Sequence, residues 1–399
     1  MSFRIGVGCV DITSLEKKYV NEVLESGRLS AGPFLGRFES EFAKAHGVKY
    51  GLMVNSGTSA LHIALLALGE LYNWQDGDEI IVPAVTFVAT ANMVMEIGLK
   101  PVFVDVDART YNIDPTKIEE KITNRTKAII PVHLFGQPCD MDPILDIAKR
   151  YNLKIIEDSC ETMFVKYRGR SVGSFGDVAC FSTYIAHLIV TGVGGLAISN
   201  DEETAKILKS LANHGRDNIY ITIDDSEKIA TDRDRLELIS RRFNFVRPGY
   251  SYRVTEMEGA LGLAQLQRRQ EIISGHQETA QKLLAGLKPF DRWLQLPYHP
   301  SYTEHAFMMF PIVIKDSNIS KSDLTMFLEK SSIETRDMLP LTNQPVYREL
   351  YGEIENQYPV AQQINRNGFY IGCHQKITDE DVSYIVETFK IFFDTHGRK

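Results

Sequence analysis

The sequence predicts an α/β fold, with a large domain built on a mostly parallel sheet and a smaller C-terminal α+β domain. Two observations lead to this prediction. Through the first half of the chain, short apolar runs bounded by turn residues alternate with segments of helical periodicity, which is typical of parallel strands covered by helices. After about residue 200 this alternation ends. We therefore expect residues 1–250, with the N-terminal segment, to form the large domain, and residues 251–399 to form an interdomain helix and the small domain.

The strands expected in the large domain are short apolar runs of the kind that is buried on both faces of a sheet. In chain order they are YGLMV (50–54), EIIVPA (79–84), KPVFVDV (100–106), KAIIPVHLF (127–135) and LKIIEDS (153–159). Apolar residues at helical spacing predict the helices between them, at 59–72, 90–98 and 141–152. Prolines lie only at the edges or ends of these runs, where a missing N–H costs least: Pro83, Pro101 and Pro131.

The second half of the chain has a different pattern. Residues 218–248 are highly charged and weakly periodic, so we expect a surface insertion there. One long helix is expected from about Thr255 to Leu287, because apolar residues recur at helical spacing along it. The small domain is expected to contain a strand in HAFMMFPIVI (305–314) and helices in DLTMFLEKS and DVSYIVETFKIFF, and to include the N-terminal helix near 13–26.

The composition excludes several classes of protein. The chain has 399 residues, of which 44% are hydrophobic and 24% are charged, as in an ordinary globular protein. Its net charge of -8 gives no electrostatic reason to expect nucleic acid as a partner. No apolar run approaches the ~20 residues of a membrane span, and the opening residues lack the apolar core of a signal peptide. We therefore expect a cytoplasmic protein without a membrane partner.

The cysteines give no sign of a disulfide framework or a metal site. They are five in number and widely dispersed, without paired spacing, so we expect reduced thiols and no metal. Their positions are Cys9, Cys139, Cys160, Cys180 and Cys373.

Polar residues follow two of the expected strands. The run Asn55 to Ser59 places small and hydroxyl residues at the start of a helix, where backbone N–H groups suit a phosphate monoester; a simple capping turn is an equal alternative. Asp158 ends a buried strand, where open α/β sheets hold their ligands. Its carboxylate suits the protonated ring nitrogen of a cofactor, and a helix cap is the alternative.

A third polar segment runs from Ser182 to Gly195. Its glycines, Gly192, Gly194 and Gly195, allow the backbone to approach a bound group closely. His187 lies five residues after Ser182. Taken alone, a single histidine is more often structural than catalytic.

These segments occur together with further motifs in a fixed order, and with them the sequence resembles the DegT/DnrJ/EryC1/StrS family of nucleotide-sugar aminotransferases. That family uses pyridoxal phosphate on an aspartate-aminotransferase-like, fold type I scaffold. The resemblance extends over nearly the whole chain. Its longest motifs are SAGPFLGRFESEFA (30–43), NSGTSALHIALLALG (55–69), VPAVTFVATANMV (82–94), PVHLFGQPCDM (131–141), GSFGDVACFS (173–182) and GYSYRVTEMEGALGLAQLQR (249–268).

The resemblance implies a set of cofactor-binding residues in the large domain. Gly57, Thr58 and Ser182 match the positions that hold the cofactor phosphate. Phe87 matches the aromatic residue that stacks on the pyridine ring, and Asp158 matches the carboxylate at the ring nitrogen.

Two further positions depart from the family pattern. Glu161 stands where most members have Gln or His near the ring hydroxyl. Ser251 stands in GYSYR where the family's Asn reaches the phosphate of the neighbouring subunit, and it is shorter by an amide arm. The resemblance implies a homodimer with shared active sites.

The largest departure is at His187, which occupies the position of the family's Schiff-base lysine. Imidazole cannot form a stable aldimine with the cofactor aldehyde. Lysine-to-histidine exchange marks one branch of the family, the sugar 3-dehydratases of the GDP-4-keto-6-deoxy-mannose 3-dehydratase type, and Tyr184-Ile185-Ala186-His187 fits its Y-x-A-H motif. Beyond the histidine the branch pattern H-x-x-M-G-E-G-G is not kept at Leu188, Ile189, Val190 and Val193.

The resemblance implies a dehydratase of deoxysugar biosynthesis, as in the lipopolysaccharide O-antigen. Pyridoxamine or pyridoxal phosphate would be held non-covalently, His187 would act as acid and base, and the C3 hydroxyl of a nucleotide-linked 4-keto-6-deoxy sugar would be eliminated. Glutamate would be the amino donor. Two alternatives remain open at this point: an aminotransferase or another pyridoxamine-phosphate enzyme working without the lysine, and a non-catalytic homologue that binds cofactor or sugar nucleotide.

Overall fold

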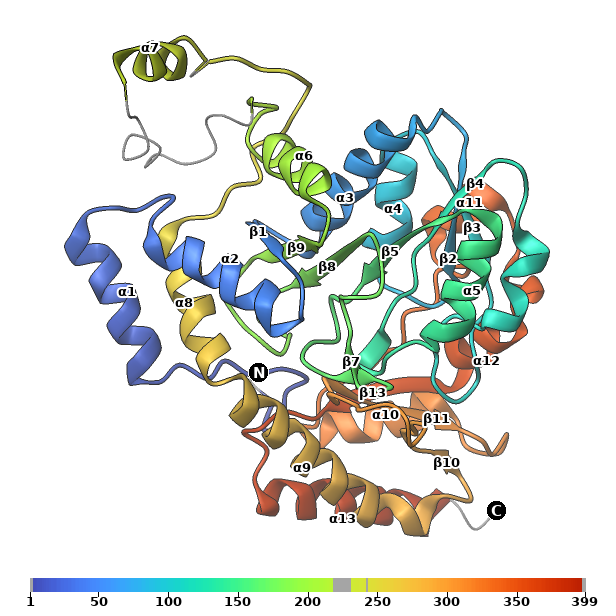
Figure 1. Ribbon diagram of the computed structural model, residues 1–399. Coiled ribbons are helices and arrows are strands. Elements are labelled where there is room, and N and C mark those ends of the chain that lie inside the picture. Colours follow the sequence, from blue (N-terminus) through green and yellow to red (C-terminus); the bar gives the residue numbers. More distant parts are fainter. Residues whose placement is uncertain (1–2, 218–230, 242, 397–399) are drawn as a thin grey trace.

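The computed structural model describes residues 3–217, 231–241 and 243–396, and a large twisted sheet lies at its centre (Figure 1). This 7-stranded sheet has the order β1-β9-β8-β5-β4-β2-β3. Within it, β9 runs antiparallel to β1 and β8, and the other neighbours are parallel, so the mostly parallel sheet is confirmed. Its strands are β1 (Tyr50–Val54), β2 (Glu79–Pro83), β3 (Lys100–Val104), β4 (Thr126–Ile129), β5 (Lys154–Asp158), β8 (Val178–Ser182) and β9 (Gly195–Ser199).

Helices cover both faces of this sheet, which is why its strands are apolar throughout. Successive residues of a strand face opposite sides, and Ile80 and Val82 pack in one apolar cluster while Ile81 packs in another. The first cluster includes most of α3, and the second includes the buried side of α5. The helices around the sheet are α2 (Pro33–Ala45), α3 (Gly57–Tyr72), α4 (Val88–Glu96), α5 (Met141–Tyr151) and α6 (Glu202–Ala212), and a two-stranded ribbon of β6 (Lys166–Tyr167) and β7 (Arg170–Ser171) lies nearby.

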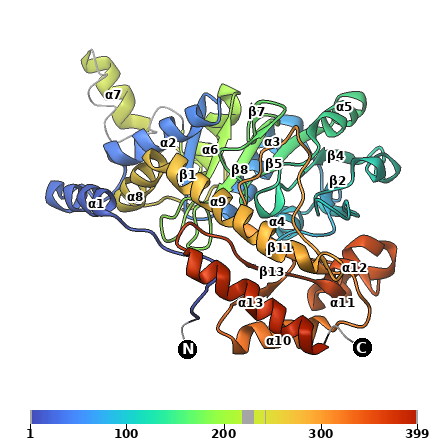
Figure 2. The same cartoon turned by 90° about the horizontal axis from the view of Figure 1, so that it is seen from below.

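A second, 4-stranded antiparallel sheet of order β10-β11-β13-β12 forms the C-terminal part. It has its own apolar cluster, in which Phe310 and Phe369 of the sheet meet Phe389 of the last helix. Viewed from below, α9 and α13 run side by side along this part (Figure 2). The elements are β10 (Leu294–Gln295), β11 (Met309–Ile314), α10 (Lys321–Lys330), β12 (Thr335–Asp337), α11 (Pro345–Tyr351), α12 (Pro359–Asn367), β13 (Gly368–Gly372) and α13 (Asp379–His396).

The single long helix expected from Thr255 to Leu287 is wrong, because the chain forms two helices there. They are α8 (Glu256–Gln267) and α9 (Arg269–Leu287), and Arg268 between them leaves helical geometry, with φ -96° and ψ 4°. Its guanidinium turns inward, where it pairs with Asp11 and Glu16 (N–O 2.5 and 3.0 Å). These buried ion pairs are long-range contacts that apolar periodicity does not reveal.

The same contacts correct the expected place of the N-terminal helix. α1 (Ser14–Ser26) packs against α8 rather than on the 4-stranded sheet. Fully buried Glu16 fixes it there, since its carboxylate accepts hydrogen bonds from Gln265 and Arg268.

The insertion expected at 218–248 lies partly outside the described residues. Of the part that the structure describes, α7 (Asp232–Arg241) projects at the upper left of Figure 1, away from the sheet. Two backbone hydrogen bonds join the ends of the insertion: Asp217 N–H donates to the Asn244 carbonyl, and Val246 N–H donates to the Gly215 carbonyl. Among the helices of the described ranges, none combines the length and the apolar character needed to cross a membrane.

Candidate active site

Three strands bring polar residues to one edge of the large sheet. β1, β5 and β8 run in the same direction, so their carboxyl ends meet at this edge. A Cβ atom on Gly57 would lie 2.8 Å from Cys160 Sγ and 3.0 Å from the Cβ of Ser182. Only glycine fits at position 57, and the structure therefore places Gly57 and Ser182 side by side, as the sequence indicated.

The turn before α3 is a helix cap. Ser59 N–H donates to Ser56 Oγ (3.0 Å), and the Ser59 hydroxyl donates to Asn55 Oδ1 (2.7 Å). The first N–H groups of a helix have no partner within it, so those of Gly57 and Thr58 suit an anion. The capping turn and an anion site are thus compatible features of one segment.

Asp158 is buried at the end of β5 and held by two hydrogen bonds. Thr90 Oγ1 donates to its Oδ2 (2.8 Å), and Cys160 N–H donates to its Oδ1 (3.2 Å). Burial raises the pKa of the Asp158 carboxyl group, and these hydrogen bonds partly offset that effect. A carboxylate that has lost its hydration is stabilised by a nearby cation. In the described part of the chain no helix lies between β5 and β6, so Asp158 is not a helix cap, and its buried carboxylate suits a positively charged ring.

Thr90 is a site residue that sequence reasoning missed. It lies one turn into α4, whose N-terminal flank is Phe87, and its N–H donates to the Phe87 carbonyl (3.2 Å). Phe87 itself is 56% exposed, so a face of its ring is open to a ligand. The only signal for Thr90 was a hydroxyl residue one turn after that aromatic residue.

Glu161 lies close to Asp158 and is partly buried. Its Oε2 accepts a hydrogen bond from Phe135 N–H (2.9 Å). Loss of hydration raises the pKa of Glu161 to about 7, helped by the negative charge of Asp158 and opposed by the Phe135 bond. Glu161 is therefore a carboxyl group that changes charge near neutral pH.

The Glu161→Gln variant is expected to flatten part of the pH dependence of stability. Folding raises the pKa of Glu161 from 4.5 to about 7, so between these pH values the native state keeps the carboxyl proton that the unfolded state has lost. The free energy of unfolding therefore falls as the pH rises from 4.5 to about 7. Relative to the variant, the wild type should lose about 1–2 kcal/mol between about pH 5 and pH 8, after allowance for solvent screening. Urea unfolding at both pH values measures the difference. Parallel curves for the two proteins would contradict the assignment.

His187 lies on the loop that joins β8 to β9. Thr183 N–H donates to the Gly194 carbonyl (3.0 Å), and Thr191 N–H donates to the Thr183 carbonyl (2.9 Å). The two threonine hydroxyls are 2.6 Å apart, and His187 N–H donates to the Tyr184 carbonyl. The loop is thus closed by bonds that do not involve the His187 side chain.

The imidazole of His187 is partly buried and uncharged at neutral pH. Its Nδ1 is shielded from solvent and has no hydrogen-bond partner of ordinary geometry in the described structure. Burial lowers the pKa of His187 to about 4, and the backbone of Tyr184 offsets part of this effect. A neutral imidazole with an unpaired nitrogen can accept a proton.

Ser251 lies on the exposed wall of a cleft of about 1000 Å³. The next residue, Tyr252, accepts a hydrogen bond at its carbonyl from Asn55 N–H (2.9 Å). Its hydroxyl accepts a hydrogen bond from Arg253 (3.2 Å). The N-terminal half of α2 and the end of α6 form other parts of the wall. In the described ranges, no cluster of three or more His, Cys, Asp and Glu side chains is placed to hold a metal ion.

The fold and this edge define the class of protein. A mostly parallel sheet, a helix N-terminus beside Ser182, and a buried Asp158 at the same carboxyl edge are the architecture of an aminotransferase-type α/β enzyme. The chain belongs to the DegT/DnrJ/EryC1/StrS aminotransferase family, whose model matches residues 10–390.

Relatives with two different reaction names resemble the chain over nearly its whole length. GDP-perosamine synthase of Escherichia coli O157:H7 is 35% identical, and the match covers 96% of each chain. GDP-4-keto-6-deoxy-D-mannose 3-dehydratase of Escherichia coli O55:H7 is 33% identical over 94% of this chain and 97% of the relative. A solved E. coli GDP-4-keto-6-deoxy-D-mannose-3-dehydratase with bound hydrated PLP superposes with a TM-score of 0.86, at 29% identity, over 97% of this chain and 100% of that one.

Proposed function

We propose that this protein is a nucleotide-sugar 3-dehydratase that uses pyridoxamine or pyridoxal phosphate without a covalent tether. Its substrate would be a nucleotide-linked 4-keto-6-deoxy sugar, and its amino donor would be glutamate. The observation that carries the proposal is His187, which stands at the family's Schiff-base position with a neutral, partly buried imidazole. Family membership alone is compatible with both amine transfer and dehydration, and the side chain at position 187 favours dehydration.

The residues at the sheet edge fit the cofactor. Gly57 packs so closely against Cys160 and Ser182 that no Cβ atom fits there, which brings the N-terminus of α3 next to Ser182. A helix N-terminus at this place suits the phosphate. Buried Asp158 suits a protonated ring nitrogen, and exposed Phe87 suits stacking on the ring. When bound, the cofactor supplies an amine for the sugar ketone and a ring that withdraws electrons. Glu161, with its pKa of about 7, would lie near the ring hydroxyl.

His187 is the acid and base of the proposal. Its neutral ring carries a nitrogen lone pair that can accept a proton and later return it. The His187 ring cannot bond covalently to an aldehyde as lysine does. The cofactor would therefore have no covalent bond to residue 187 between turnovers. In the net reaction glutamate gives up two electrons to become 2-oxoglutarate and releases its nitrogen as ammonia. The sugar's C3–O bond is broken and replaced by a C3–H bond.

The proposal includes a cytoplasmic homodimer with shared active sites. Ser251 and Arg253 lie on the wall of the open cleft of about 1000 Å³, within reach of another molecule docking there. A second copy in this cleft would bring polar side chains of one subunit toward the site of the other. In each subunit, residues 1–250 would bind the cofactor and residues 251–399 would form the interdomain helices and the small domain.

Product analysis tests the function directly. The protein is incubated with pyridoxal phosphate, glutamate and GDP-, CDP- or dTDP-linked 4-keto-6-deoxy sugars, and the sugar products are identified by NMR and mass. We expect a product without the C3 oxygen, together with equal amounts of ammonia and 2-oxoglutarate. A 4-amino sugar with its C3 oxygen retained would instead establish an aminotransferase. Failure to bind the cofactor would leave a non-catalytic homologue.

A further inference from the structure

A segment near the N-terminus crosses behind the loop that carries His187. We call residues 6–11 the strap. Just before it, Ile5 pairs with the strand region of the small sheet: its N–H donates to the Ser332 carbonyl (3.1 Å), and its carbonyl accepts from Glu334 N–H (2.9 Å). Val7 N–H then donates to Glu334 Oε2 (2.7 Å). The first end of the strap is therefore attached to the 4-stranded sheet.

The other end of the strap is attached at the break between α8 and α9. The Asp11 carboxylate pairs with Arg268 (2.5 Å) and Lys376 (2.7 Å). Gln265 Nε2 also donates to the Asp11 carbonyl (2.9 Å). The Asp11 and Arg268 side chains are only 13% and 12% exposed, so this pairing is better shielded from water than an ordinary surface ion pair.

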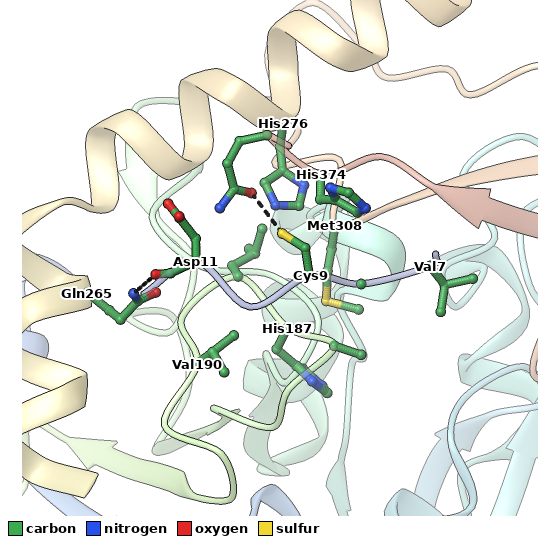
Figure 3. Close-up of a pocket in the computed structure, with 13 residues that line it drawn as sticks. Val7, Cys9, Asp11, His187, Val190, Gln265, His276, Met308 and His374 are labelled. Carbon is green, nitrogen blue, oxygen red and sulfur yellow. Dashed lines mark hydrogen bonds between the residues drawn. The ribbon is translucent and has the colours of Figure 1, made fainter. Parts of the chain in front are cut away.

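Between these attachments the strap touches the His187 loop at one glycine. A Cβ atom on Gly8 would lie 2.9 Å from Ala186 Cα and 3.2 Å from Ala186 Cβ. No side chain fits between the two backbones at this point. Figure 3 shows the imidazole of His187 pointing away from Cys9 and His276, so the strap contacts the loop on the side opposite to the ring.

Little free space separates the strap from the loop. The cavity between them measures about 10 Å³, and its polar lining includes Cys9, Asp11, His276, His374 and Gln375. Burial raises the pKa of the Cys9 thiol to about 11 and lowers the pKa of His276 to about 4, so these two groups are neutral at pH 7. Burial also lowers the pKa of His374. Among the polar groups of the lining, Asp11 carries a charge that its two cationic partners neutralise.

We propose that Gly8 is a positioning residue for His187, and that the strap, held at Glu334 and Asp11, fixes the imidazole by supporting its loop from behind. This inference rests on the proposed acid–base role of His187. The 4-stranded sheet and the break between α8 and α9 together determine the position of the His187 imidazole. Displacement of a catalytic group by ~1 Å can cost on the order of 10²-fold in rate.

Two glycines of the same strap provide a matched pair of variants. Gly8→Ala places a methyl group against backbone atoms of the loop, whereas a Cβ on Gly6 meets only ordinary contacts at 3.4 Å. Neither glycine has a positive φ, so both accept alanine without backbone strain. His187 is followed through the NMR titration of ring-labelled histidine, assigned by the signal that His187→Asn removes. The turnover rate with the sugar substrate is measured in parallel.

For Gly8→Ala we expect the His187 titration to move by at least about one pH unit toward the ordinary histidine value, because the displaced ring gains water. The turnover rate should fall on the order of 10-fold or more, with KM changed less than kcat. Gly6→Ala should match the wild type in both measurements. Equal titrations and rates for folded Gly8→Ala and Gly6→Ala would overturn the proposal.

Two provisions keep the test decisive. If Gly8→Ala does not fold, Asp11→Asn replaces it. This change removes the ion pairs with Arg268 and Lys376 and keeps the hydrogen bond from Gln265 to the Asp11 carbonyl. The same shift in the His187 titration is expected, and its absence would overturn the proposal. The titration needs no substrate. A shifted titration in a protein that forms no 3-deoxy product would therefore support the strap and contradict the dehydratase function.

Discussion

Replacing His187 by asparagine is expected to lower the dehydration rate by about 10²- to 10⁴-fold, the usual contribution of a positioned acid or base. Asparagine keeps a polar group at the place of the imidazole Nδ1 and cannot take up a proton. The loop itself should persist, since Thr183, Thr191 and the backbone of Tyr184 close it without the imidazole. Steady-state turnover measures the loss, and thermal melting checks that the fold is retained.

A second histidine serves as the control for this prediction. His299 is exposed and bonded to the carbonyls of its own turn, so His299→Asn should leave turnover unchanged. His187→Lys gives an independent check, because a lysine amine at this position should attach to pyridoxal phosphate and remain attached after borohydride reduction. Intact-mass measurement detects the added cofactor. Near-wild-type turnover by His187→Asn would remove His187 from the mechanism.

Replacing Glu157 by glutamine is expected to destabilise the protein by about 3 kcal/mol or more. Glu157 is fully buried beside Asp158, and its two oxygens accept hydrogen bonds from Gly173, Phe175 and Gly176 N–H groups (2.6–2.7 Å). A glutamine would turn one NH₂ group toward these donors. At least one buried N–H would then lose its acceptor.

The fourth partner of Glu157 strengthens this prediction. His133 Nδ1 accepts a hydrogen bond from Cys139 N–H (2.9 Å), so its other nitrogen carries the proton and donates to Glu157 (3.1 Å). Denaturant unfolding measures the change in free energy. Glu278→Gln, on the exposed side of α9, is the control and should unfold as the wild type does. Equal midpoints for the two variants would contradict the predicted role of Glu157.

The sequence predicts β1, β2, β3, β4 and β5 of the large sheet, and it does not predict β8 and β9. An apolar run marks β5 clearly, and Asp158 stands where that run ends. β8, which ends at Ser182, is not among the expected strands. Parallel strands bring their carboxyl ends to one edge, and the structure places Gly57 beside Ser182 there. In the sequence, only the family resemblance relates these two residues. The sequence also indicates that His187 stands at the position of the family's Schiff-base lysine, because the motif around it matches the family motif.

What the sequence does not reveal depends on contacts between residues far apart in the chain. Thr90 donates to Asp158 across 68 positions, and neither residue type predicts the other. Arg268 interrupts an apolar helical pattern where it pairs with Asp11 and Glu16, which are 257 and 252 positions away. Local periodicity indicates which face of a helix or strand is buried. It does not indicate which charged residue from elsewhere in the chain contacts that face.

The closure of the β8–β9 loop bears on which side chains can stand at position 187. Thr183 and Thr191 hold the loop through their own hydroxyl and backbone groups, so its shape does not depend on the side chain at 187. The side chain at position 187 can therefore be exchanged without loss of the loop's shape. The loop thus separates the stability of the fold from the choice of the side chain that it presents, so residue 187 can vary while the scaffold is retained.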